Sequence, residues 1–271
     1  MNILQNFIPK KKLSQNFLID KNILKKISSS ASIQNDDIIL EIGPGLGHLT
    51  TELLTYKFHK LIIIEKDKDL IEILQKKFTS PNILLIHDDF LKLDLSFLKK
   101  IISTKKIKII SNIPYNISTP ILVKLLRNHK LFSQITLTIQ EELANRICAK
   151  DVDKNKGSIS IFTKLFSADQ KILFNISNKS FFPIPKVTSS VIQLTCKDHI
   201  ELPVDIVPLF ETFMKSIFSK RRKKITSCLK GLYDKTAIKE ACEASQINMN
   251  KRPEELSYDL FIKLFNFLHI N

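Results

Sequence analysis

The stretch Ile38–Gly47 reads IILEIGPGLG and decides the fold. Its first five residues are apolar apart from Glu41 and predict a buried strand, and the residues after Gly47 have the spacing of an amphipathic helix. The chain has only 5 glycines, and three of them, Gly43, Gly45 and Gly47, lie in this stretch. This clustering indicates a turn with unusual backbone angles. The order strand, glycine turn, helix is typical either of a tight connection without a ligand or of a loop where a ligand approaches the backbone.

Short apolar runs rich in isoleucine recur along the first half of the chain, with amphipathic segments between them. They occupy residues 38–42, 61–64, 83–86, 107–111 and 135–139. This regular alternation predicts an α/β, Rossmann-like fold with a mainly parallel sheet. In such sheets ligands bind beyond the carboxyl ends of the strands, so the residues that close each run are the informative ones.

The residues that close these runs are all polar or turn-forming: Gly43–Gly47, Glu65, Asp88–Asp89, Asn112–Tyr115 and Gln140–Glu141. Glu65 lies 22 residues after Gly43, where an acid binds the ribose hydroxyls of a nucleotide. The alternative is an ordinary surface acid at a strand end. One of Asp88 and Asp89 can accept a hydrogen bond from the exocyclic amine of an adenine ring, and we favour Asp89.

Two kinds of cofactor are compatible with these acids. A dinucleotide requires the pattern GxGxxG, whereas the spacing here is Gly43-x-Gly45-x-Gly47 with Glu41 before it. This departure favours a nucleoside linked to an amino acid, such as S-adenosylmethionine, whose ammonium and sulfonium groups are attracted to an acid. No metal is expected, because the 6 histidines are scattered without the spacing of metal ligands.

The fourth apolar run is followed by Asn112, Ile113, Pro114 and Tyr115. An adenine amine is a poor nucleophile, and its methylation requires acceptors that hold the N–H groups. The side-chain oxygen of Asn112 and the carbonyl near Ile113–Pro114 are suited to this, since Pro114 orients the turn. Tyr115 is suited to stack on a base extruded from its helix. The alternative is a plain turn after a strand.

The formal charge of +15 indicates an anionic partner, nucleic acid first. A chain rich in Lys, Ile, Asn and Phe is also typical of an AT-rich genome, so the charge alone decides little. No apolar run approaches the ~20 residues of a membrane span, and we expect no membrane partner. The 4 cysteines are widely spaced and form no CxxC pair, which predicts a reduced, cytoplasmic protein.

Helical patterns replace strands from about residue 202. We therefore predict an α/β domain over residues 1–195, which carries the candidate cofactor site, and a helical domain over residues 196–271, in which a basic run suggests RNA binding. The cations Lys220, Arg221, Arg222, Lys223 and Lys224 follow an amphipathic helix, and contact with RNA phosphates is the favoured interpretation. A solvated helix end is the alternative. Arg221 also shares a helical stripe with Ile217 and Ile225, which suggests a structural role for it.

Phe181 and Phe182 lie in a proline-containing connection between two predicted strands near residues 170–176 and 187–195. One of them is suited to form the second wall of a base-stacking slot. The alternative is that the phenylalanines belong to the core.

Four stretches together resemble the rRNA adenine dimethyltransferases. They are Gln15–Leu18, Glu41–Gly47, Asn112–Ile117 and Phe182–Val187. The resemblance covers essentially the whole chain and is greatest to the bacterial small-subunit members, although the family usually has Leu at the position of Ile113. It implies that S-adenosylmethionine is bound by Asn16, Leu18, Gly43, Glu65, Asp89 and Asn112, to which the glycine loop adds Gly45. It also implies that Asn112, Pro114 and Tyr115 face the target amine.

The resemblance further implies dimethylation of two adjacent adenosines near the 3′ end of 16S rRNA and a role in small-subunit biogenesis. The expected partner is this rRNA or a 30S-type pre-ribosomal particle, and the expected state is a monomer. The basic arm Lys10–Lys12 is expected to be ordered partly by cofactor and RNA. Two alternatives remain: a large-subunit rRNA adenine dimethyltransferase, and a non-catalytic RNA-binding or assembly factor on the same fold.

Overall fold

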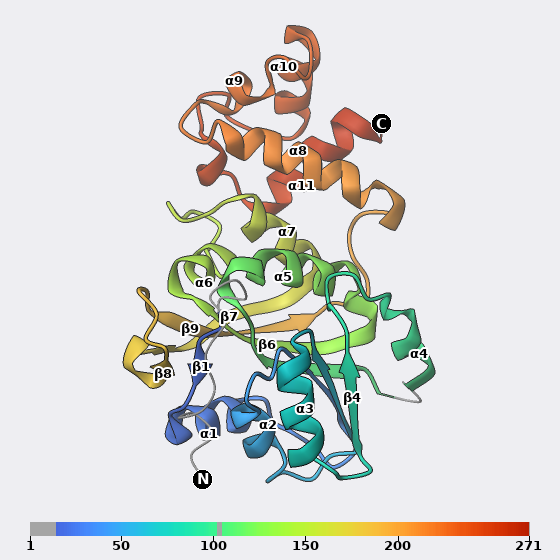
Figure 1. Cartoon of the computed structure of the whole chain (residues 1–271). Helices are drawn as coiled ribbons and strands as arrows, with labels where there is room; N and C mark the ends of the chain where they lie inside the picture. The colour runs from blue at the N-terminus through green and yellow to red at the C-terminus, as the bar shows by residue number, and fades with distance from the viewer. Residues whose placement is uncertain (1–14, 102–104, 271) are drawn as a thin grey trace. The chain divides into compact units, whose positions relative to one another are not determined.

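The computed structural model describes residues 15–101 and 105–270, which form two compact units (Figure 1). The first unit contains the described residues up to Ala144 and the segment Ala168–Asp198. The second contains Asn145–Ser167 and the described residues from His199 onward. The predicted basic arm, Lys10–Lys12, lies outside the described residues.

The first unit is built on a seven-stranded sheet with the order β4-β3-β2-β5-β6-β9-β7. The strands are β2 (Ile38–Ile42), β3 (Lys60–Glu65), β4 (Ile83–His87), β5 (Ile107–Asn112), β6 (Phe132–Gln140), β7 (Ser167–Ile176) and β9 (Ser189–Cys196). Neighbouring strands from β4 to β6 run parallel, and β9 pairs antiparallel with β6. The mainly parallel sheet predicted from the apolar runs is therefore confirmed.

The central strand β2 shows why these runs form this sheet. All five of its residues are buried, as expected for a parallel strand covered on both faces. Ile39 pairs with Leu61 of β3 on one side and with Lys108 of β5 on the other. Because β3 lies on one side of β2 and β5 on the other, the strand order reverses its direction at β2. The ends of β2 and β5 therefore form the switch point where ligands bind in such sheets.

The first unit also contains a small sheet and the helices that cover the large one. Strand β1 (Phe17–Leu18) pairs antiparallel with β8 (Phe181–Phe182). The helices are α1 (Lys21–Ser30), α2 (His48–Leu53), α3 (Lys68–Lys77), α4 (Leu98–Ile101), α5 (Ser118–Arg127) and α6 (Glu141–Ile147), whose last residues enter the second unit. Leu24 and Ile27 of α1 and Leu49 of α2 join Ile39 of β2 in one apolar core.

The second unit is helical. Its helices are α7 (Ser158–Phe166), α8 (Val207–Ser219), α9 (Ile225–Leu229), α10 (Lys235–Ala244) and α11 (Tyr258–His269). Phe210 and Phe213 of α8 pack on Phe265 of α11 with ring centroids 5.0 and 5.4 Å apart. No helix in the described ranges is both long and apolar enough to cross a membrane.

Residues 145–167 belong to the second unit, whereas the sequence places them in the first domain. The reason is a set of polar contacts with the C-terminal segment. The buried Lys156 donates to the carbonyl of Leu256, and Asp151 accepts from the amide of Tyr258 at 3.2 Å. Helix α7 also packs on α8. These contacts join residues distant in sequence, so local patterns do not predict them.

Candidate active site

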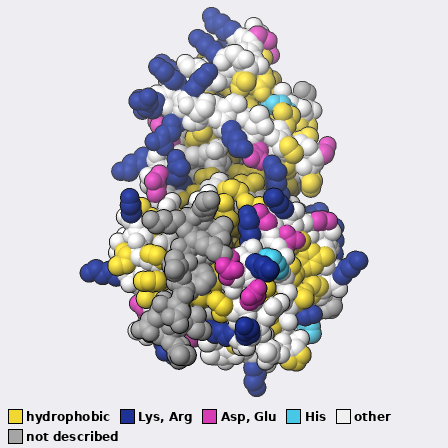
Figure 2. Space-filling model, in the orientation of Figure 1, with side chains coloured by type: hydrophobic (Ala, Val, Ile, Leu, Met, Phe, Trp, Pro, Cys, Tyr) yellow, Lys and Arg dark blue, Asp and Glu magenta, His cyan; other side chains and the backbone are white. Residues whose placement is uncertain are grey.

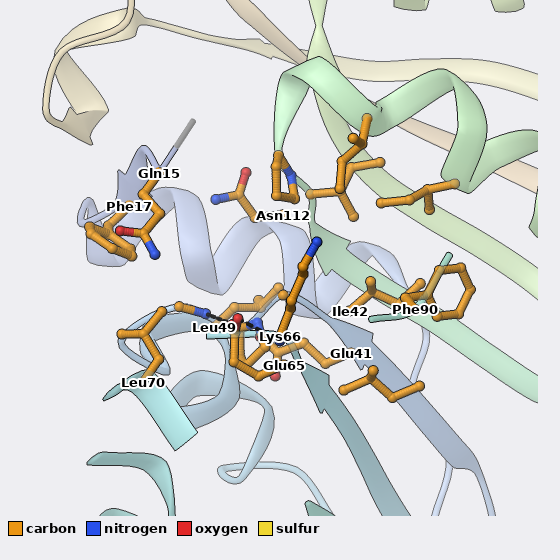
Figure 3. Close-up of a pocket in the computed structure, with 18 of the residues that line it drawn as sticks. Gln15, Phe17, Glu41, Ile42, Leu49, Glu65, Lys66, Leu70, Phe90 and Asn112 are labelled. Atoms are coloured by element: carbon orange, nitrogen blue, oxygen red, sulfur yellow. Dashed lines mark hydrogen bonds between the residues drawn. The ribbon is translucent and has the colours of Figure 1, made fainter. Parts of the chain in front are cut away.

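A cavity lies at the carboxyl ends of the parallel strands, where residues from several separate segments meet (Figure 3). Its lining includes residues 15–18, 41–45, 64–66, 88–91 and 112–117. Every residue predicted to bind the cofactor or to face the target amine is among them. The topology therefore brings together four of the five sets of polar strand ends that the sequence singled out. The fifth, Gln140–Glu141, does not line the cavity, and Glu141 instead accepts hydrogen bonds from Asn175 and Thr188.

The glycine loop has the left-handed backbone that its composition predicts. The φ angles are +63° at Gly43, +60° at Gly45 and +72° at Gly47. A Cβ on Gly45 would lie 2.7 Å from the ring of Phe17, and one on Gly47 would lie 2.5 Å from the ring of Phe78. The glycines are thus required by backbone angle and by close packing. The loop is both a tight turn and a wall of the cavity.

Glu65 is held at the end of β3 by three backbone amides. Its Oε1 accepts from Lys66 and Asp67, both at 2.8 Å, and its Oε2 accepts from Gly45 at 3.3 Å. Burial raises the pKa of Glu65, and the three amides oppose that rise. Since an ionised carboxylate has about four acceptor positions, it can still accept from a ligand hydroxyl. The contact from Gly45 links the acid directly to the glycine loop.

Asp89 lies in the loop after β4, beside Lys66. Its Oδ1 accepts from the amide of Leu91 at 3.0 Å, and its Oδ2 pairs with Lys66 Nζ at 3.0 Å. Burial raises the pKa of Asp89, but Lys66 and the Leu91 amide outweigh this and hold the pKa below its ordinary value. Asp88 accepts from the amide of Asp89 at 2.6 Å. Both acids line the cavity, and the choice of Asp89 for an adenine amine stays a prediction.

Asn112 ends β5 and presents an unusual acceptor. Its Nδ2 donates to the carbonyl of Asn16 at 3.5 Å, whereas its Oδ1 is buried and has no hydrogen-bond partner among the described residues. Buried polar atoms are normally satisfied, so this oxygen is a candidate for binding a donor that enters the cavity. Figure 3 shows Asn112 at the cavity, across from Glu65.

The carbonyl that can act beside Asn112 is that of Ile113. The carbonyl of Pro114 already accepts from Ser118 Oγ at 3.0 Å and from the amide of Ile117, in the turn before α5, at 3.3 Å. A Cβ on Gly43 would lie 3.5 Å from Pro114 Cδ, so this turn packs against the glycine loop. The candidate acceptors and the glycine loop are therefore neighbours.

Tyr115 is fixed on the wall of the cavity by its hydroxyl and its ring. The hydroxyl forms a 2.5 Å hydrogen bond with Ser189 Oγ, and burial raises its pKa. Phe181 meets the ring edge-on, with centroids 6.4 Å apart. Phe181 is buried, whereas Phe182 is 42% exposed. Phe181 thus supports Tyr115 from the core, and Phe182 is the one available for contact with a base.

Glu41 is fully buried in β2 and also lines the cavity. Thr50 Oγ1 donates to its Oε2 at 2.6 Å, and burial raises the pKa of Glu41 to about 8. Lys77 of α3 donates to the carbonyls of Leu46 and Gly47 at 3.1 and 3.3 Å, and its charge favours ionisation of Glu41. A cationic ligand in this cavity would likewise lower the pKa of Glu41 and favour its ionised form.

Sequence analysis did not identify Gln15, Lys66 or Lys77, which hold the loops around the cavity in place. Gln15 Nε2 donates to Asp67 Oδ2 at 2.9 Å and fastens the segment before β1 to the end of β3. Lys66 and Lys77 contact the loops as described above. Gln15 lies in a stretch that resembles the family, so it could have been found. A single lysine carries no signal in a chain with 42 Lys and Arg residues.

The basic run predicted to contact RNA lies in the second unit. Lys220, Arg221, Arg222, Lys223 and Lys224 are all exposed in the turn between α8 and α9. The structural role suggested for Arg221 is therefore wrong, because α8 ends at Ser219 and the helical stripe does not continue to Arg221. Figure 2 shows Lys and Arg side chains gathered around the α9–α10 end of this unit. Among the described residues, no three His, Cys, Asp or Glu side chains form a metal-binding group.

Comparisons with known proteins agree with the resemblance seen in the sequence. The ribosomal RNA small subunit methyltransferase A of Mycoplasma mobile is 39% identical over 256 residues, covering 94% of this chain and 96% of the relative. A dimethyladenosine transferase structure from Plasmodium falciparum is 27% identical, with a TM-score of 0.71, and covers 92% of this chain and 95% of that chain.

The structure of the 23S rRNA methyltransferase ErmE is 21% identical, with a TM-score of 0.70, and covers 93% of this chain and 99% of that one. At this identity the likeness shows a shared fold only. The model of the family described as ribosomal RNA adenine dimethylase matches residues 6–269. Because this match and the Mycoplasma relative span nearly the whole chain, the chain belongs to the ribosomal RNA adenine dimethylase family.

Proposed function

We propose that this enzyme transfers methyl groups from S-adenosylmethionine to the N6 atoms of two adjacent adenosines near the 3′ end of small-subunit (16S) rRNA. Four transfers give two N6,N6-dimethyladenosines, and the modification belongs to small-subunit biogenesis. The observation that carries the proposal is the buried Oδ1 of Asn112, which has no partner within residues 15–101 and 105–270, at a cavity walled by the glycine loop. The relative from Mycoplasma mobile, named for the small subunit, supports this choice of rRNA.

The residues of the cavity fit S-adenosylmethionine. Glu65 is suited to the ribose hydroxyls, Asp89 to the adenine amine, and the buried Glu41 to the positive charges. Asn16, Leu18, Gly43 and Gly45 complete the predicted lining. When bound, this cofactor supplies an activated methyl group on a sulfonium. No metal is part of the proposal.

The chain's own residues then act on the target amine. In the first transfer, Asn112 Oδ1 and the Ile113 carbonyl accept its two N–H groups and hold the nitrogen for in-line attack. In the second transfer, one of these acceptors holds the single N–H that remains. Tyr115 stacks on the extruded base, and its bond to Ser189 keeps the ring in place. After transfer the nitrogen is cationic and acidic, so its proton passes to water without a strong base. Catalysis is largely positioning.

Binding to RNA is assigned to two exposed features. The cations Lys220–Lys224 are available for phosphates, and Phe182 is available for a base. The partner is the small-subunit rRNA, alone or in a 30S-type pre-ribosomal particle. The enzyme is expected to act as a monomer in the cytoplasm, where ribosomes are assembled.

A methylation assay with mapped products tests the proposal. Purified enzyme is incubated with S-adenosylmethionine and with unmethylated 16S rRNA, free or in particles, and primer extension locates the product. Methylation of two adjacent adenosines near the 3′ end is expected, with Asn112→Ala at least ~100-fold slower. Modification of large-subunit rRNA instead would favour the large-subunit alternative. No transfer, with Asn112→Ala binding the particles as tightly as wild type, would favour a non-catalytic assembly factor.

A further inference from the structure

Lys124 makes three hydrogen bonds that the proposed chemistry does not use. Its Nζ donates to the carbonyls of Phe90 at 2.7 Å, Leu91 at 3.0 Å and Leu93 at 2.5 Å. The side chain is half-buried on α5, and its ammonium lies 5.3 Å from the centre of the Phe90 ring. All three ammonium protons are therefore used on a single short loop.

This loop forms one wall of the cofactor cavity. It follows β4, and its residues 88–91 line the cavity beside Glu65 and Asn112. Asp89 Oδ1 accepts from Leu91, so the acid assigned to the adenine amine depends on the shape of the same loop. Phe90 is buried and cannot follow a change in the loop without repacking. A shift of the loop backbone would therefore move Asp89.

Lys124 also connects this wall to the proposed catalytic turn. Helix α5 begins at Ser118, directly after the turn that contains Asn112 and Tyr115. The Lys124 side chain thus links α5, which follows the Asn112–Tyr115 segment, to the Phe90–Leu93 loop. Burial lowers the pKa of Lys124, and the negative charges of Asp89, Asp94 and Asp88 oppose that change and favour the ammonium form.

We propose that Lys124 is a positioning residue for the Phe90–Leu93 loop. It holds this loop as the adenine wall, the side of the cofactor site that contacts the adenine ring, and keeps it in a fixed position relative to the turn after Asn112. The inference rests on the proposed cofactor. Only lysine suits the position, because three protons on one nitrogen converge on three carbonyls. The planar fork of arginine spreads its donors and reproduces the set incompletely. Methionine keeps the apolar stem but offers no donor.

Cofactor affinity is the first test. Lys124→Met is expected to weaken binding of S-adenosylmethionine about tenfold or more in calorimetry, because three partly buried carbonyls lose a charged donor. The kcat at saturating cofactor should stay within about threefold of wild type, and Lys124→Arg should restore part of the affinity. Lys92→Met is the matched control, since Lys92 is exposed on the same loop. Unchanged affinity in Lys124→Met would overturn the inference.

A second ligand separates positioning from general loss of stability. S-inosylhomocysteine lacks the N6 amine of S-adenosylhomocysteine, so the wild-type preference between them reports the adenine wall. Lys124→Met should reduce that preference at least about threefold. Equal weakening of both ligands, with a lowered melting temperature, would indicate a merely structural lysine and overturn the inference. If wild type binds neither ligand, the proposed cofactor fails instead, and the two failures are distinguishable.

Discussion

Glu41 makes the stability of this enzyme depend on pH in an unusual direction. Burial raises its pKa from an ordinary value of 4.5 to about 8. Between these values the unfolded chain has lost the proton and the folded chain keeps it. The contribution of Glu41 to stability is therefore fully present below pH 4.5 and is lost as pH rises toward 8. Most carboxylates that are paired in the fold behave in the opposite way.

The substitution Glu41→Gln removes this titration and keeps an acceptor for Thr50 Oγ1, which lies 2.6 Å from Glu41 Oε2. One proton bound only by the folded state costs about 1.4 kcal/mol per pH unit. From pH 6 to pH 8 the free energy of unfolding of wild type should therefore fall by about 2 kcal/mol relative to Glu41→Gln. Other groups titrate in both proteins, so the difference isolates Glu41.

Urea denaturation at pH 6, 7 and 8 measures the difference. Glu72→Gln, a change at an exposed acid on α3, is the matched control and should follow wild type. A cationic cofactor favours ionised Glu41, so added S-adenosylmethionine should restore much of the stability that wild type loses at pH 8. Parallel pH profiles for wild type and Glu41→Gln would refute the reasoning.

Three further predictions follow from the geometry. Gly45→Ala combines a φ of +60° with a Cβ 2.7 Å from the Phe17 ring and should lower the free energy of unfolding by about 2–3 kcal/mol in urea titrations. Gly157→Ala is the control: its Cβ would meet no described atom within 4 Å, and it should change the free energy of unfolding by less than about 1 kcal/mol. Tyr115→Phe keeps the stacking ring and should retain kcat within about tenfold, whereas Tyr115→Ala should lose about tenfold or more in single-turnover assays. Arg221→Gln combined with Arg222→Gln should lower the slope of log affinity against log salt by up to about 2 in RNA-binding titrations, with kcat on saturating RNA nearly unchanged.

The sequence by itself determined the sheet and the location of the site. Buried parallel strands are marked by local apolar runs, and β2 to β6 lie where those runs predicted them. The carboxyl ends of parallel strands meet at one edge, so the polar residues after the first four runs converge on the cavity, although Gln140–Glu141 after the fifth run does not line it. This is why Glu65, Asp89 and Asn112 could be named before their contacts were seen.

Tertiary structure decided which atoms are available at that site. Adjacent residues of a strand face opposite sides, so only the register of β1 and β8 shows that Phe181 is buried and Phe182 exposed. The Oδ1 of Asn112, without a partner in the part of the chain that the structure describes, and the three carbonyl contacts of Lys124 likewise depend on segments distant in the chain. The glycine loop is typical of a ligand site in sequence, but its close packing under Phe17 follows only from the fold. Local sequence patterns predict which residues are buried, because burial follows from the spacing of apolar residues. Hydrogen-bond partners depend on which distant segments the topology brings together.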